Sequence, residues 1–127
     1  MSTTRKSRRR ELRHPVSREK LAWVEFEYPG PGGKRHRLPL INVSRAGVAF
    51  LVSSDDGPSG LELGAKLSET ILRVEDCMIY GQMLIMHLTA VSETCQLCGT
   101  LFYARSDSEL VKFKSVIDGM VPPLVNT

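Results

Sequence analysis

The segment LAWVEFEY, residues 21–28, alternates apolar and acidic side chains from Val24 to Tyr28. In an extended chain Ala22, Val24, Phe26 and Tyr28 share one face. Glu25 and Glu27 share the other. This period of two residues is typical of a β-strand with one buried face. The segment therefore predicts a strand whose apolar side belongs to a core.

The same extended pattern continues through most of the chain. A turn cluster, PGPGGK at residues 29–34, is of the kind that joins antiparallel strands. Pro39 in the next run predicts an edge position or a bulge. The later strand-like runs cover residues 35–43, 47–53, 65–74, 78–91 and 94–104. Six strands with one apolar face each must close or fold over to bury it, so we predict a mainly β fold, a small six-stranded antiparallel β-barrel.

After residue 105 the period becomes that of a helix. Apolar residues recur at helical spacing as far as Met120. Ser106 and Glu109, three residues apart, match a capping box at the start of this segment. Pro122 and Pro123 end it. We predict one C-terminal α-helix that covers an opening or an edge of the barrel.

The charge of the chain is distributed unevenly. The 127 residues carry a formal net charge of +3, yet residues 1–20 hold eight Lys and Arg against two Glu. The rest of the chain is therefore mildly acidic, and an anionic partner is expected for the arm rather than for the body. We predict a basic flexible N-terminal arm at 1–20, a barrel with its helix at 21–121 and a tail at 122–127.

Several function classes are not favoured by the composition. The basic N-terminus is not followed by an apolar segment, and no stretch is long and apolar enough to span a bilayer. We therefore expect a cytoplasmic protein with reduced thiols and no membrane partner. Cys95 and Cys98 have zinc-like spacing, but positions three apart in a strand face opposite sides. With no nucleophile–base set and no phosphate loop, we expect no enzyme activity, no metal and no cofactor.

The string NVSRAG, residues 42–47, lies at the junction of two predicted strands. Asn42 and Ser44 are two residues apart, so their side chains project on the same face of an extended chain. Gly47 allows a positive φ angle or a close approach of the backbone to a ligand. Together they would form a polar recognition patch, although such a string alone is also typical of an ordinary turn.

The arm supplies a second motif. Arg9 and Arg13 flank three residues, giving R-x-x-x-R, and N-x-S-x-x-G follows about thirty residues later. That pair, ahead of a predicted barrel and terminal helix, resembles the PilZ domain, the bacterial receptor for cyclic di-GMP. The segment GTLFYARSDSELVKF, residues 99–113, extends the resemblance, because the family commonly has a glycine followed by an aromatic residue there. The chemistry agrees, since a forked guanidinium can pair with phosphate oxygens or with the guanine edge and can stack on a purine.

The resemblance implies a role for each motif residue. Arg9 and Arg13 would clamp guanine edges and phosphates. Asn42 would hydrogen-bond guanine, Ser44 would add a short polar contact, and Gly47 would keep the strand junction open. The family more often has Asp at the position of Asn42, so binding is expected to survive with altered affinity.

Arg8 bears on the number of ligands. In the family, an arginine directly before R-x-x-x-R accompanies an intercalated cyclic di-GMP dimer. Arg8 occupies that position, so we expect Arg8 to bind ligand and two ligand molecules to bind each chain.

Three interpretations of function remain. The first is a non-catalytic cyclic di-GMP receptor or adaptor, whose arm changes conformation on binding and which signals to a partner protein. The second is a nucleic-acid-binding protein with a basic arm and a small barrel, for which affinity would fall steeply with salt. The third is a PilZ-type adaptor that no longer binds ligand. The intact motif residues favour the first, and nucleic acid is not the expected partner.

Overall fold

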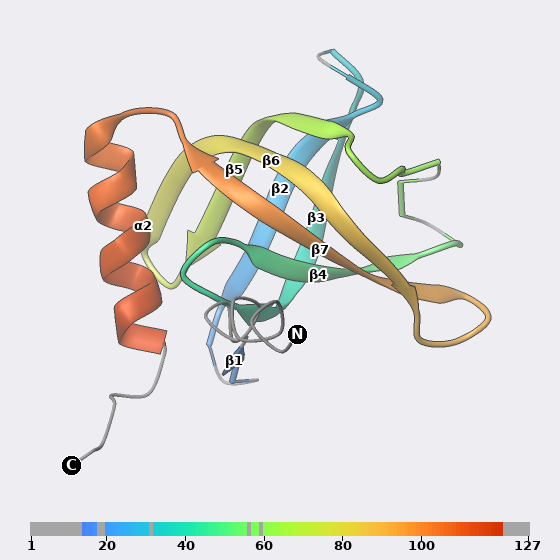
Figure 1. The fold of residues 1–127 in the computed structure, drawn as a ribbon, viewed down its shortest axis with the longest axis horizontal. Coiled ribbons are helices and arrows are strands. Elements are labelled where there is room, and N and C mark those ends of the chain that lie inside the picture. Colours follow the sequence, from blue (N-terminus) through green and yellow to red (C-terminus); the bar gives the residue numbers. More distant parts are fainter. Residues whose placement is uncertain (1–13, 18–19, 31, 56, 59, 121–127) are drawn as a thin grey trace, which may run out of the picture.

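The computed structural model describes residues 14–17, 20–30, 32–55, 57–58 and 60–120. These residues form seven strands and one helix (Figure 1). The strands are β1 (His14–Pro15), β2 (Ala22–Tyr28), β3 (Lys34–Val43), β4 (Val48–Ser53), β5 (Lys66–Val74), β6 (Cys77–Ala90) and β7 (Cys95–Ala104). The helix is α2 (Asp107–Met120).

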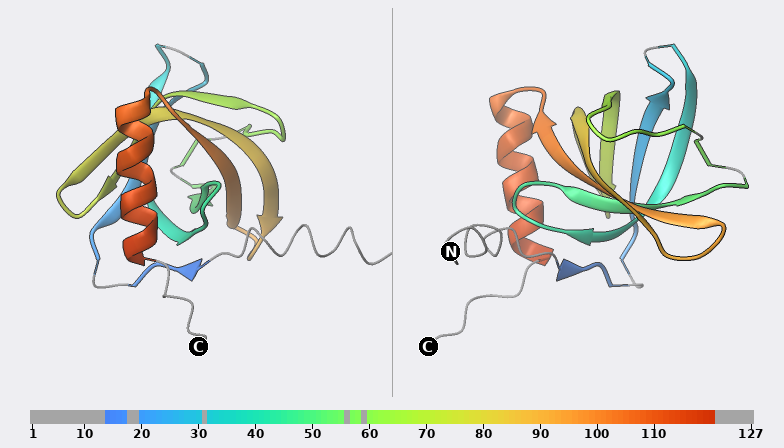
Figure 2. Two further views of the ribbon diagram at one scale, coloured as in Figure 1. Left: turned by 60° about the vertical axis from the view of Figure 1, so that its left-hand side comes forward. Right: turned by 45° about the vertical axis from the view of Figure 1, so that its right-hand side comes forward.

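Six antiparallel strands, β2 to β7, close into a barrel (Figures 1 and 2). The strand order is β3-β2-β5-β6-β7-β4, and pairing of β3 with β4 closes the ring. Leu40 of β3 lies opposite Phe50 of β4 at this closure. The predicted six-stranded barrel is therefore confirmed.

The core fills the inside of the barrel. Val24 and Phe26 of β2 are fully buried. Glu25 and Glu27, which alternate with them, are part-exposed on the outer face. The Phe26 ring packs on Phe50, with centroids 5.5 Å apart. Burying one such side chain contributes about 1.5–3 kcal/mol. The alternation of residues 21–28 thus places one apolar face in the core, as predicted.

Helix α2 lies at one end of the barrel (Figure 2) and packs on β6 and β7. Phe113 and Ile117 are its buried apolar residues, and the Phe113 ring lies 4.9 Å from that of Phe102. Ser106 accepts a hydrogen bond from the Glu109 amide, as in a capping box. The Glu109 carboxylate accepts one from the Tyr80 amide of β6, 2.8 Å away, and so joins the start of the helix to the barrel.

The predicted edge and bulge of β3 are both present. Residues Lys34 to Pro39 pair with β2 alone in the described part of the chain, so one edge of β3 is open there. Pairing with β4 starts at Leu40, and the register shifts between Leu40 and Asn42. Pro39 lacks an amide proton and is therefore accommodated just before the second partner strand begins.

Strand β1 shows that the sheet begins earlier than the expected arm boundary at residue 20. His14 pairs with Val43 and Pro15 with Asn42. Since β4 occupies the other edge of β3 at Asn42, β1 continues the line of β2. The amide of Val16 donates to the Ile41 carbonyl at 2.9 Å, and Val16 packs against the core. His14 and Pro15, which belong to the expected arm, thus form a strand of the sheet.

Candidate ligand-binding site

The turn of residues 42–47, which we call the motif turn, is organised around Ser44. The Ser44 hydroxyl oxygen accepts hydrogen bonds from the amides of Ala46 and Gly47, each at 3.2 Å. The Ser44 amide donates to the Gly47 carbonyl at 2.9 Å. Ser44 is only 1% exposed. Its side chain therefore holds the turn together, a role typical of serine in tight turns and consistent with the ordinary-turn interpretation of the string. Its contact with ligand stays a prediction.

Gly47 is required by a neighbouring strand. A Cβ at Gly47 would lie 1.9 Å from the Thr100 carbonyl oxygen of β7, far inside contact distance. The amide of Phe102 donates to the Ala46 carbonyl at 3.0 Å and holds β7 in this place. Gly47 does not have a positive φ. The positive-φ alternative is therefore wrong, and the close approach seen here is to β7.

Asn42 lies where three strands meet. It is half-buried and is paired with Ala49 of β4 and with Pro15 of β1. The next pair along joins Val43 to His14, the residue that directly follows Arg13 in the sequence. The residue that follows the arginine motif in the sequence is thus paired with the strand that leads into the motif turn.

The predicted residues Arg8, Arg9 and Arg13 lie outside the described part of the chain. The structure brings Asn42, Ser44 and Gly47 together in one turn. Their contacts with the arginines stay predictions.

Arg45 is a charged residue of the motif turn that the sequence analysis did not single out. It forms an ion pair with Asp118 in the last turn of α2. Both side chains are exposed, at 65% for Arg45 and 59% for Asp118. The motif turn is therefore connected to β1 on one side and to α2 on the other. The feature of the sequence that pointed to Arg45 was its place as a cation inside the N-x-S-x-x-G string.

Solved structures share this architecture. A complex of MrkH from K. pneumonia with c-di-GMP superposes with a TM-score of 0.72 at 15% identity, covering 87% of this chain and 50% of MrkH. The PilZ domain of YcgR from Escherichia coli with c-di-GMP gives 0.70 at 13% identity, covering 89% of this chain and 91% of that domain. The barrel has a PilZ-like fold. No protein-family model and no curated protein sequence matches the chain.

The two matches cover different shares of the solved proteins. The chain spans about half the length of MrkH and nearly the whole PilZ domain of YcgR. At 13–15% identity, the likeness establishes the fold of the PilZ-like domain.

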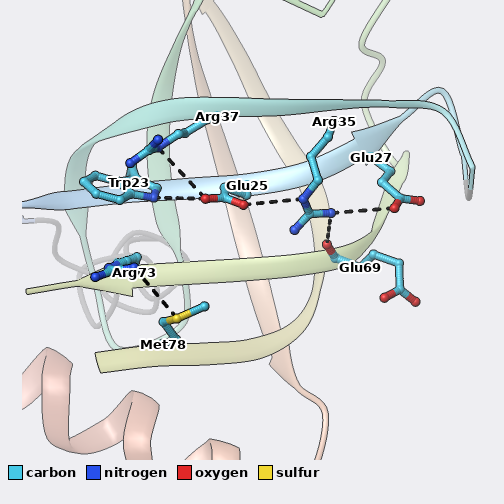
Figure 3. A network of polar contacts seen from close by, with 8 residues as sticks. All are labelled: Trp23, Glu25, Glu27, Arg35, Arg37, Glu69, Arg73 and Met78. Carbon is cyan, nitrogen blue, oxygen red and sulfur yellow. Dashed lines mark hydrogen bonds and ion pairs between the residues drawn. The ribbon is translucent and has the colours of Figure 1, made fainter. Parts of the chain in front are cut away.

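A second polar cluster covers the outer face of β2, β3 and β5 (Figure 3). The Arg37 guanidinium lies 3.8 Å from the centroid of the Trp23 ring, and that of Arg73 lies 5.5 Å from it. Arg35 forms ion pairs with Glu25 at 3.4 Å and Glu27 at 3.7 Å. These glutamates balance much of the positive charge on β3. The cluster therefore resembles an internally paired surface more than an open anion site.

Two cavities of about 370 Å³ each lie away from the motif turn. One is lined by residues of β5, β6 and β7, which include Tyr80 and Tyr103, and by Arg105 just after β7. The other lies near residues 52–61 and 90–96. Neither is lined by a residue of the motif turn.

The remaining ionisable groups have structural explanations. Burial raises the pKa of the Cys98 thiol to about 12, so this cysteine is a core residue. The hydrogen bond from the Tyr80 amide, together with Lys112, lowers the pKa of Glu109. Within the described residues, no group of three or more His, Cys, Asp or Glu could hold a metal ion. Helix α2 is not long and apolar enough to cross a membrane.

Proposed function

We propose that this PilZ-like domain is a non-catalytic receptor for cyclic di-GMP, which it binds between the N-terminal arm and the motif turn. The observation that carries the proposal is the register of β1, which sets His14 opposite Val43. His14 directly follows R-x-x-x-R in the sequence and Val43 belongs to N-x-S-x-x-G, so the pairing supports a site in which the two motifs lie close together. The same fold in MrkH and in the YcgR PilZ domain was solved with c-di-GMP bound, which supports this ligand.

The chemistry of the motifs fits a cyclic dinucleotide. Arg9 and Arg13 supply forked cations that pair with phosphodiester oxygens or with the O6 and N7 acceptors of guanine. Asn42 supplies both a donor and an acceptor for a guanine edge. Ser44 and Gly47 hold the turn in the shape that presents Asn42. Arg8 adds a further charge, and with it we propose that two ligand molecules bind.

Signalling would follow from the position of β1. This strand has two residues and joins the edge of β3 at the motif turn. Ligand that bridges the arm and the turn would change the conformation of the arm and present a new surface to a partner protein. No enzymatic step is needed for this role.

A nucleic-acid-binding arm is the second candidate, because residues 1–20 carry eight cations against two anions. MrkH, which shares the fold, is described as a c-di-GMP-dependent transcription regulatory factor. The barrel itself favours this less, because Arg35 and Arg37 on its outer face are paired with Glu25 and Glu27.

Titration calorimetry tests the proposal. We expect cyclic di-GMP to bind with micromolar or tighter affinity and a discrete ratio, and cyclic di-AMP to bind at least tenfold more weakly because adenine lacks O6. A DNA duplex should be titrated in parallel at low and high salt. Duplex binding with a steep salt dependence and no heat from cyclic di-GMP would support the nucleic-acid function instead. Absence of both would indicate an adaptor that does not bind ligand.

A further inference from the structure

Arg45 combines a fixed backbone with an exposed cation. The amides of Ala46 and Gly47 are held by the Ser44 hydroxyl, and the Ala46 carbonyl is held by Phe102. The Arg45 side chain extends from this fixed turn and is 65% exposed. A guanidinium on a fixed backbone loses less conformational freedom when it binds an anion.

The surroundings of Arg45 form a small cavity between the motif turn and α2. This cavity of about 130 Å³ is lined by Arg45, Lys114, Ile117 and Asp118. Two cations therefore border it, and the Asp118 carboxylate pairs with one of them. Ile117, which is 2% exposed, closes the side toward the core.

We propose that Arg45 is an additional ligand-binding residue, which exchanges the Asp118 carboxylate for a phosphodiester oxygen of the bound cyclic dinucleotide. Both anions carry one negative charge and accept the forked donors of a guanidinium. An exposed ion pair is weak, so a ligand already held by the motif can displace it. This inference rests on the proposed function and adds a route by which binding reaches α2.

The exchange would loosen one end of the helix and leave the other in place. The first turns of α2 are joined to β6 through Glu109, which accepts from the Tyr80 amide, and through Lys112, which donates to the Met78 carbonyl at 2.8 Å. The last turn is held by the burial of Ile117, by the packing of Met120 against the core and by the pair of Asp118 with Arg45. Loss of that pair therefore acts on residues 117–120 alone.

A double-mutant cycle on cyclic di-GMP affinity tests the exchange. Arg45→Ala should weaken binding about fivefold, since it removes a charge-assisted contact. Asp118→Asn should strengthen binding about twofold, because the competing carboxylate is gone. The strengthening should vanish in the Arg45→Ala background. Arg105→Ala is the matched control: its guanidinium lies 4.7 Å from the Tyr80 ring, away from the motif turn, and affinity should be unchanged.

Hydrogen exchange supplies the second measurement. Amides of residues 117–120 should exchange faster when cyclic di-GMP is added to the wild type. In Asp118→Asn they should exchange fast without ligand, and amides of residues 109–113 should be unaffected in both. Because both pair members are exposed, these variants should fold, which melting curves would check.

Two results would overturn the exchange while leaving the receptor function intact. One is wild-type affinity in Arg45→Ala. The other is strengthening by Asp118→Asn that persists without Arg45. If the wild type itself fails to bind cyclic di-GMP, the proposed function fails and the exchange fails with it.

Discussion

The two sides of the proposed binding site are held to the barrel very differently. The motif turn is fixed from within, by the buried Ser44 and by Gly47 against the backbone of β7. The arm joins the sheet through β1, a two-residue strand whose Pro15 is exposed. Substitutions in the turn should therefore cost stability, and substitutions in the arm should cost affinity without changing the fold.

The largest expected effect comes from Gly47→Ala. Its Cβ would lie 1.9 Å from the Thr100 carbonyl oxygen, so β7 and the motif turn must separate. We expect a loss of about 3 kcal/mol in the free energy of unfolding, and more for Gly47→Val. Urea denaturation measures it. Gly119→Ala is the matched control, because nothing lies within 4 Å of its Cβ position and alanine favours a helix. Equal stability of Gly47→Ala and Gly119→Ala would show that the close approach of Thr100 does not exclude a side chain at position 47.

Gly47 also shows which parts of the structure could be predicted from the sequence. The residues 21–28 and the later runs carry a period of two, which is a local property, and the barrel strands follow it. The collision at Gly47 involves a carbonyl 53 positions away in the sequence, and no local pattern reports such a contact. The sequence thus predicted that a glycine is needed but not the reason.

The same distinction applies to β1 and to Arg45. A strand of two residues that contains proline has no periodic pattern, so it was included in the arm. The pairing of Arg45 with Asp118 joins residues 73 apart and depends on where α2 docks. By contrast, the start of α2 was predictable, because its capping serine and its apolar spacing are both local.

On the arm side, Arg9→Ala and Arg13→Ala should each weaken cyclic di-GMP binding at least tenfold. Losing a charge-assisted bidentate contact costs about 1.5–3 kcal/mol. Thermal melting of both variants should match the wild type, since substitutions in the arm are expected to lower affinity without changing the fold. Calorimetry measures the affinity, and Arg5→Ala and Lys6→Ala are the controls. If the controls lose as much as the motif variants, the arm acts by bulk charge.

Ser44→Ala tests whether the hydroxyl of Ser44 stabilises the motif turn. The substitution leaves the amides of Ala46 and Gly47 without their acceptor in a buried turn. We expect a loss of about 1–2 kcal/mol in the free energy of unfolding, together with weaker binding. Thr is the informative replacement, because Ser44→Thr keeps the hydroxyl. Weaker binding with unchanged stability in Ser44→Ala would mean that the hydroxyl serves the ligand rather than the turn.

The smallest expected effect concerns the number of ligands rather than the fold or the affinity, and it depends on Arg8. Two stacked cyclic di-GMP molecules bring four phosphodiester charges together, and a third guanidinium offsets their repulsion while offering another flat face for a guanine. We expect two ligands per chain in the wild type and a ratio near one in Arg8→Ala, with the remaining affinity largely kept. Arg10 has the same charge but lies out of register with R-x-x-x-R, so Arg10→Ala should keep a ratio of two. Calorimetry on the three proteins gives the ratios directly. A wild-type ratio near one, or the same ratio in Arg8→Ala and Arg10→Ala, would contradict this role of Arg8. Arg8 would then contribute only its charge to the arm, and its position next to R-x-x-x-R would not matter.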